Sequence, residues 1–144
     1  MTLFRLAVLS LLLAPLPLHA APDPHAARIS RILKATPLID GHNDWPEALA
    51  EKAKDARWPM DLTRLDPATY HTDLDRLRAG GVGGQFWSVW VSADLPQVQQ
   101  VKDTLDQIGM VHSLAARYPH HITLVRTAAE LRAAHKAGRI GSLI

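Results

Sequence analysis

Residues 37–46 of the chain read Pro-Leu-Ile-Asp-Gly-His-Asn-Asp-Trp-Pro, an apolar start that leads directly into a polar cluster. The segment 38–40 is typical of a short buried strand, and Gly41 marks the point where this strand opens into a loop. His42 and Asp44 are one residue apart, so in extended backbone their side chains leave on the same face. An imidazole nitrogen and a carboxylate oxygen suit Zn²⁺ and related divalent ions. The stretch therefore predicts a strand that ends in two metal ligands, although an isolated His-x-Asp is more often part of an ordinary turn.

Helical and extended patterns alternate along the rest of the chain. Apolar spacing, capping residues and glycine stops predict helices at 24–35, 47–57, 73–79, 98–114 and 127–136. Further strands are predicted at 82–91 and 139–144, with a brief extended piece at 122–125. The strand at 82–91 carries apolar groups on both alternating faces, so we expect it to be covered on both sides. The order strand, helix, strand, helix, strand indicates parallel β/α units with right-handed crossovers.

The clearest helix, 98–114, has an apolar face built from residues at steps of three and four. Its members are Val98, Val101, Leu105, Ile108, Val111 and Leu114. The polar side chains on the opposite face are Lys102, Asp103, Asp106 and Gln107. This division predicts that the apolar face packs against the sheet and that the polar face meets solvent.

Composition narrows the class of protein. A hydrophobic fraction of 47% is what one globular domain with a buried core requires. Sixteen basic residues against 14 acidic ones leave a net charge of only +2, which argues against a nucleic-acid partner. The chain has no cysteine, so it has neither disulfides nor a thiolate zinc site, and a bound metal would need His, Asp or Glu ligands.

The first 20 residues have the pattern of a secretory signal. One positive charge, Arg5, precedes the apolar run 6–14, and the small pair Ala20-Ala21 follows. Cleavage after Ala20 would leave a mature chain of residues 21–144. The alternative, a short membrane anchor, is disfavoured because the apolar run falls well below the ~20 residues that span a bilayer. We therefore expect an exported protein, periplasmic or extracellular.

Three segments resemble one known family. Residues 37–46 are similar to the opening strand and loop of the membrane dipeptidase (renal dipeptidase) family. Residues 71–89, His-Thr-Asp-Leu-Asp-Arg-Leu-Arg-Ala-Gly-Gly-Val-Gly-Gly-Gln-Phe-Trp-Ser-Val, resemble its next helix end and second strand, and residues 138–144 resemble its third strand. The resemblance runs from about Ile29 to Ile144, in the family's order and spacing.

The resemblance implies an α/β fold, the N-terminal part of a (β/α)₈ TIM-type barrel with about three strands present. It implies a zinc metallopeptidase in which two zinc ions share a bridging carboxylate and a bridging water that attacks the peptide bond of a dipeptide. By motif position, His42 and Asp44 would bind one of the two ions. Asp40 would orient an imidazole or a backbone group and would not itself be a ligand.

The chain is short for such a barrel, which typically needs ~250 residues. We therefore expect residues 21–144 to be a truncated part of the catalytic barrel, with the bridging Glu, the other His ligands and all catalytic residues downstream of Ile144. Two protein ligands fall short of the three that a catalytic zinc takes, so the chain alone is expected to bind zinc weakly and to be inactive.

Two rival hypotheses remain beside the dipeptidase. One is another metal-dependent amidohydrolase on the same barrel, but these enzymes commonly carry His-x-His after the first strand, and Asp44 favours the dipeptidase. The other is an exported binding or structural module without activity. Small dipeptides are the expected substrates, whereas side-chain preference, homodimerisation and membrane attachment stay open.

Other histidines and the tryptophans are assigned structural roles. His120 and His121 follow a helix end, where a cation offsets the helix dipole. His112 and His135 are expected at the surface or its boundary, and His71 is expected to make a structural hydrogen bond. Packing is the expected role of Trp45, Trp58, Trp87 and Trp90, although Trp45 could instead wall the metal pocket.

Overall fold

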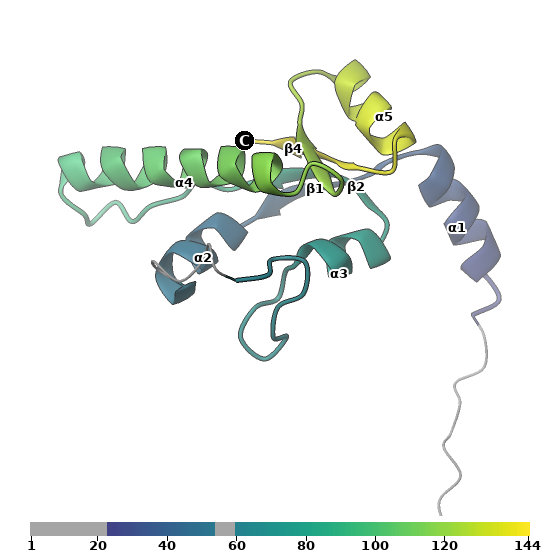
Figure 1. Ribbon diagram of the computed structural model, residues 1–144, viewed down its shortest axis with the longest axis horizontal. Coiled ribbons are helices and arrows are strands. Elements are labelled where there is room, and N and C mark those ends of the chain that lie inside the picture. Colours follow the sequence, from purple (N-terminus) through teal and green to yellow (C-terminus); the bar gives the residue numbers. More distant parts are fainter. Residues whose placement is uncertain (1–22, 54–59) are drawn as a thin grey trace, which may run out of the picture.

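The computed structural model describes residues 23–53 and 60–144, and at its centre lies a four-stranded parallel sheet (Figure 1). The strands are β1 (Leu38–Asn43), β2 (Val82–Trp87), β3 (Ile122–Leu124) and β4 (Ile140–Leu143), in the order β1-β2-β4-β3. The predicted α/β class with parallel strands is confirmed, and the three predicted strands are neighbours in the sheet. The prediction of three strands is one too few, because the extended piece at 122–125 pairs with the outer edge of β4 as β3.

The limits of the first two strands differ from the prediction. β1 continues to Asn43, and β2 ends at Trp87. The prediction that 38–40 is buried is wrong: Leu38 and Ile39 are 43% and 42% exposed. The reason is that β1 pairs only with β2 within the described part of the chain, so it forms an edge of the sheet. β2 is buried along most of its length, as predicted, with Phe86 as the exposed exception.

The described residues form five helices. They are α1 (Ala26–Ala35), α2 (Trp45–Ala53), α3 (Leu74–Ala79), α4 (Gln97–Arg117) and α5 (Ala128–Lys136). Of these, α1 precedes β1 and buries none of its residues. Two begin with side-chain caps, since Asp73 accepts from the Arg76 N–H and Thr127 accepts from the Glu130 N–H. The C-cap of α3 is Gly80, and the next residue, Gly81, has a positive φ (76°), a conformation that a Cβ disfavours. The predicted signal at 1–20, Trp58 and the predicted helical residues 54–57 lie outside the described residues.

The helices cover opposite faces of the sheet. On one face, side chains of α2, α3 and α4 form the larger core around Trp87 of β2; Trp45, Leu74 and Val111 are representative members. On the other face, Leu131 of α5 packs among Val125 and Leu143. α5 approaches the sheet so closely that a Cβ at Gly84 would stand 2.8 Å from Leu131 Cδ1. Strand glycines therefore set how near this helix lies.

The prediction for the apolar face of α4 is only half correct. Met110, Val111 and Leu114 in its second half are buried, but Val98, Val101 and Leu105 in its first half are 84%, 62% and 60% exposed. The helix is long, and its first half extends past the sheet (Figure 1).

Gln107, which the helical pattern placed on the polar face, is instead buried. Its Nε2 donates to the Trp90 carbonyl at 2.7 Å, so the connection between β2 and α4 covers it. No helix among the described residues has both the length and the apolar character needed to cross a membrane.

Candidate metal centre

The predicted metal ligands flank the junction between β1 and α2. β1 ends at Asn43, and α2 begins at Trp45. The Asn43 Oδ1 accepts a hydrogen bond from the Trp45 backbone N–H at 3.0 Å, which satisfies one of the free donors at the start of the helix. The Ser88 N–H donates to the Asn43 carbonyl at 3.0 Å and holds the end of β1 against the end of β2. His42 and Asp44 are thereby presented at the carboxyl edge of the parallel sheet.

The two side chains point toward each other. His42 Nε2 lies 2.9 Å from Asp44 Oδ1, and the two side chains are 70% and 54% exposed. A nitrogen and an oxygen bound to one tetrahedral zinc are separated by about 3.3 Å, given bond lengths of about 2.0–2.2 Å. The pair therefore needs to open by only a few tenths of an ångström to share an ion. Both donor types suit zinc, so the residues present fit half of such a site.

Asp40 holds the backbone of this pair through a hydrogen bond. Its Oδ1 accepts from the His42 backbone N–H at 3.2 Å, and its Oδ2 accepts from the Gln85 side-chain amide at 2.9 Å. The Asp40 carboxylate thus holds the backbone that carries His42. Among the described residues it forms no hydrogen bond with the His42 imidazole or with the Asp44 side chain. This contact is of the kind expected from the sequence, where Asp40 was assigned to orient a backbone group.

An additional residue in β1 explains why Asp40 and His42 face different ways. Asp40 pairs with Gln85 and Asn43 pairs with Trp87, so three steps along β1 match two steps along β2. Such a bulge changes the alternation of side chains. As a result, Asn43 returns to the side of Gln85, with its Nδ2 3.5 Å from Gln85 Oε1, while His42 is exposed.

The predicted pair is not joined by a third ligand here. No group of three or more His, Asp or Glu side chains with metal-site geometry occurs among residues 23–53 and 60–144. The geometry brings His42 and Asp44 together, and their role as metal ligands stays a prediction.

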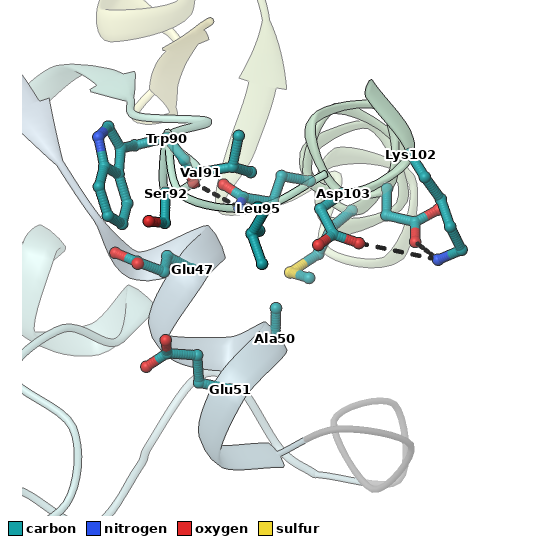
Figure 2. Close-up of a pocket in the computed structure, with 12 residues that line it drawn as sticks. Glu47, Ala50, Glu51, Trp90, Val91, Ser92, Leu95, Lys102 and Asp103 are labelled. Carbon is teal, nitrogen blue, oxygen red and sulfur yellow. Dashed lines mark hydrogen bonds and ion pairs between the residues drawn. The ribbon is translucent and has the colours of Figure 1, made fainter. Parts of the chain in front are cut away.

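The surroundings of the pair are acidic. Burial raises the pKa of the Glu47 carboxyl, and the negative charges of Glu51 and Asp44 raise it further. Glu47 and Glu51 come from α2 and line an open pocket of about 560 Å³ whose other walls are the β2–α4 connection and α4. Figure 2 shows Glu47 with Trp90 and Ser92 on one side of this pocket. The negative potential of these carboxylates favours cations near the carboxyl edge of the sheet.

The tryptophans divide into two groups. Trp45 is buried and stacks obliquely on Trp87, with ring centroids 5.5 Å apart, so the core role is confirmed and Trp45 does not wall the metal pocket. Trp87 Nε1 also donates to Ser142 Oγ at 2.7 Å. The packing role predicted for Trp90 is wrong, because the connection after β2 leaves this ring more than half exposed, in the wall of the pocket.

The remaining histidines lie away from the pair. His112 is exposed and His135 is half-buried, as predicted. His71 is exposed, and its side chain forms no hydrogen bond with another described residue, so the predicted bond is not observed there. After the end of α4, His120 is exposed, whereas the His121 ring packs edge-on against Tyr118 at 6.2 Å. The helix-end role predicted for His121 is therefore incomplete, because its ring also packs against Tyr118.

Sequence reasoning missed Gln85, the residue that connects the site to the sheet. Its side chain is fully buried and bonded to Asp40, and Asn43 Nδ2 reaches both Gln85 Oε1 and, at 3.2 Å, Thr72 Oγ1. A signal was present, since Gln85 is a long polar residue inside an apolar strand and a buried amide requires partners.

Comparison with known proteins identifies the family. The model of the family described as membrane dipeptidase (peptidase family M19) matches residues 26–144. The chain belongs to the membrane dipeptidase family. A curated relative, Dipeptidase ataJ of Aspergillus terreus, is 35% identical over 133 residues, and the match covers 85% of this chain and 31% of that dipeptidase.

A solved structure supports the fold. A metallopeptidase from Rhodobacter sphaeroides, solved with a phosphinate mimic of the dipeptide L-Ala-D-Ala, superimposes with a TM-score of 0.64 at 23% identity. The match covers 74% of this chain and 36% of that one. This chain of the membrane dipeptidase family thus spans about a third of the length of the relatives that it matches.

Proposed function

We propose that the chain is the amino-terminal, metal-binding part of a zinc-dependent dipeptidase, whose full-length form hydrolyses the peptide bond of dipeptides. The observation that carries the proposal is the approach of His42 Nε2 to Asp44 Oδ1, 2.9 Å apart at the carboxyl end of β1. Enzymes built on parallel β/α units keep their active sites at this end of the strands. Membership of a family of dipeptidases supports the reaction.

In this proposal His42 and Asp44 bind the same zinc ion of a two-zinc centre, and each residue supplies one ligand. Bound zinc lowers the pKa of a coordinated water and polarises the substrate carbonyl. The part of Asp40 is to hold the His42 backbone, through the 3.2 Å hydrogen bond, so that the imidazole faces the carboxylate. The catalytic groups and the remaining ligands belong to the part of the full-length enzyme beyond Ile144, so the isolated chain is inactive.

Dipeptides are proposed as substrates on the strength of the relatives. One relative is named a dipeptidase, and another was solved with a mimic of a dipeptide. Export to the periplasm or the extracellular space is also proposed; it rests on the pattern of residues 1–20, with residues 21–144 as the mature chain.

Zinc titration of the purified protein tests the metal site. Isothermal titration should show weak zinc uptake by the chain, and His42→Ala and Asp44→Ala should each remove it, because one ligand cannot hold the ion. His112→Ala is the matched control, since His112 is exposed on α4 away from the pair. Zinc uptake that survives both site substitutions would contradict the assignment of the ligands.

A chimera tests the reaction. Residues 26–144 would replace the matching segment of the Aspergillus terreus dipeptidase, which supplies the rest of the barrel. The expected result is dipeptide turnover that a chelator abolishes, zinc restores and His42→Ala eliminates. A folded chimera without turnover, or turnover by the isolated chain, would show that the proposal is wrong.

A further inference from the structure

A cleft of about 270 Å³ lies at the amino ends of the strands, and five of its lining side chains are basic. They are Lys34, Arg78, His121, His135 and Arg139, and we call this surface the basic cleft. Every other residue that lines it is apolar or glycine. A cleft lined by cations and no carboxylate, in a chain whose net charge is only +2, concentrates positive potential at one place.

The topology of the fold brings these residues together. Lys34, Arg78 and His135 lie in the last turns of α1, α3 and α5. His121 directly precedes β3, and Arg139 directly precedes β4. Helices that return between parallel strands end where the next strand begins, so their last turns gather at one edge of the sheet (Figure 1). The basic cleft is therefore at the opposite end of the strands from His42 and Asp44.

Helix dipoles account for only part of this charge. The three helix ends contribute roughly −0.5 each, about −1.5 in all, and the short α3 contributes less than a long helix. Lys34, Arg78 and Arg139 contribute three full positive charges. None of the three forms an ion pair with a carboxylate of the described residues. An excess of at least about one and a half positive charges therefore remains.

The imidazoles shape the walls of the basic cleft. His135 Nε2 lies 3.3 Å from the Lys34 carbonyl, a contact that joins the end of α5 to the end of α1. His121 Nδ1 is buried and has no hydrogen-bond partner in the described part of the chain. Buried nitrogens are normally paired, so this side of the basic cleft has an unused polar atom.

We propose that the basic cleft binds an oxyanion of the phosphate type. The guanidinium groups of Arg78 and Arg139 offer planar pairs of N–H donors that suit phosphate oxygens, and Lys34 adds a third charge. The source of the oxyanion is either free phosphate or the headgroup of an anionic lipid. This site is independent of the proposed zinc centre, because it shares no residue with it and lies at the other end of the sheet.

Inorganic phosphate is the first probe. Backbone amide resonances of the purified protein would be followed by NMR as phosphate replaces chloride at constant ionic strength. Saturable shifts are expected around Gly81 and Gly138, which line the basic cleft. Arg78→Gln and Arg139→Gln should each weaken binding by about tenfold, because each removes charge-assisted hydrogen bonds. The matched controls are Arg126→Gln and Arg132→Gln, which remove the same charge from exposed positions outside the cleft.

Vesicles distinguish the two sources. Phosphatidylglycerol vesicles would be compared with phosphatidylcholine vesicles in a sedimentation assay, with the same four variants checked for folding by circular dichroism. Phosphate binding that the cleft variants weaken and the controls leave unchanged supports free phosphate. Binding only to phosphatidylglycerol, with the same dependence on the variants, supports a lipid headgroup. The absence of both, or equal effects of cleft and control variants, overturns the proposal.

Discussion

Replacing the buried amide of Gln85 with a leucine is expected to weaken both folding and zinc binding. Gln85 Nε2 donates to Asp40 Oδ2 at 2.9 Å and lies 3.1 Å from the Phe86 carbonyl. Asp40 in turn accepts from the His42 N–H at 3.2 Å. Gln85→Leu keeps a side chain of similar size in β2 but removes the donor, so a half-buried carboxylate oxygen loses its partner.

The magnitude follows from the type of bond. A hydrogen bond to a charged group contributes about 1.5–3 kcal/mol, and the apolar leucine recovers part of this in a fully buried position. We expect a net loss of about 2 kcal/mol in the free energy of unfolding, which lowers the Tm of a domain of this size by roughly 6–10 °C. Zinc affinity should fall about 10–100-fold, the usual effect of removing a group that orients a ligand.

A double-mutant cycle separates the contact from other effects of the substitution. Urea unfolding would be measured for the wild type, Gln85→Leu, Asp40→Ala and the double variant, with zinc titration of each folded protein. A coupling energy of about 1–2 kcal/mol is expected between the two positions. Gln97→Leu is the control, because Gln97 is exposed at the start of α4. A coupling below about 0.5 kcal/mol, or unchanged zinc affinity in folded Gln85→Leu, would refute the reasoning.

Two further substitutions test the scaffold. Burial alone would raise the pKa of Asp73, but hydrogen bonds from backbone N–H groups and from Arg76 hold this pKa below its ordinary value. Asp73 therefore stabilises the fold above its unfolded pKa of about 3.9, and this stability is lost as the pH falls through the lowered folded pKa. Between pH 6 and pH 2, the free energy of unfolding in urea should fall less steeply for Asp73→Asn than for the wild type. Equal pH dependence in the two proteins would contradict this account. A Cβ at Gly83 would stand 2.6 Å from Pro37 Cβ, so Gly83→Ala should destabilise by about 1–3 kcal/mol in thermal unfolding, whereas Gly109→Ala, with nothing within 4 Å, should not.

Local sequence patterns predicted the elements well because their causes are local. Asp73 and Thr127 cap helices through bonds to residues three positions later, and the positive φ of Gly81, just after the C-cap of α3, depends only on that residue's lack of a Cβ. The parallel class followed from the alternation of strands and helices. None of these features depends on distant parts of the chain.

Patterns that depend on tertiary context were predicted less well. The period of α4 marks an apolar face, but whether that face is covered depends on how far the helix extends past the sheet, so Val98 and Val101 were misplaced. Likewise, the buried position of Gln107 depends on the connection that carries Trp90. A sequence pattern gives the direction of a side chain, not the presence of a neighbour.

For the candidate site, spacing found His42 and Asp44, and the pair is in contact. The supporting bond from Gln85 to Asp40 joins residues 45 positions apart, so it requires the register of β1 on β2. The bulge before Asn43 could not be read from the sequence, because a register shift exists only relative to a partner strand.

That bulge makes the number of residues between Asp40 and Asn43 as important as their identity. Asp40 pairs with Gln85 and Asn43 pairs with Trp87, so both residues face the same side of the sheet although they are three positions apart. Deleting Gly41 would leave two steps on each strand, so Asn43 would stay opposite Trp87, but His42 would directly follow Asp40 and the two-residue spacing of their hydrogen bond would be lost. Substitutions in this segment change one side chain at a time, whereas a deletion removes the bulge and the spacing between Asp40 and His42 together. Any graft or alignment through residues 40–43 must therefore preserve its exact length.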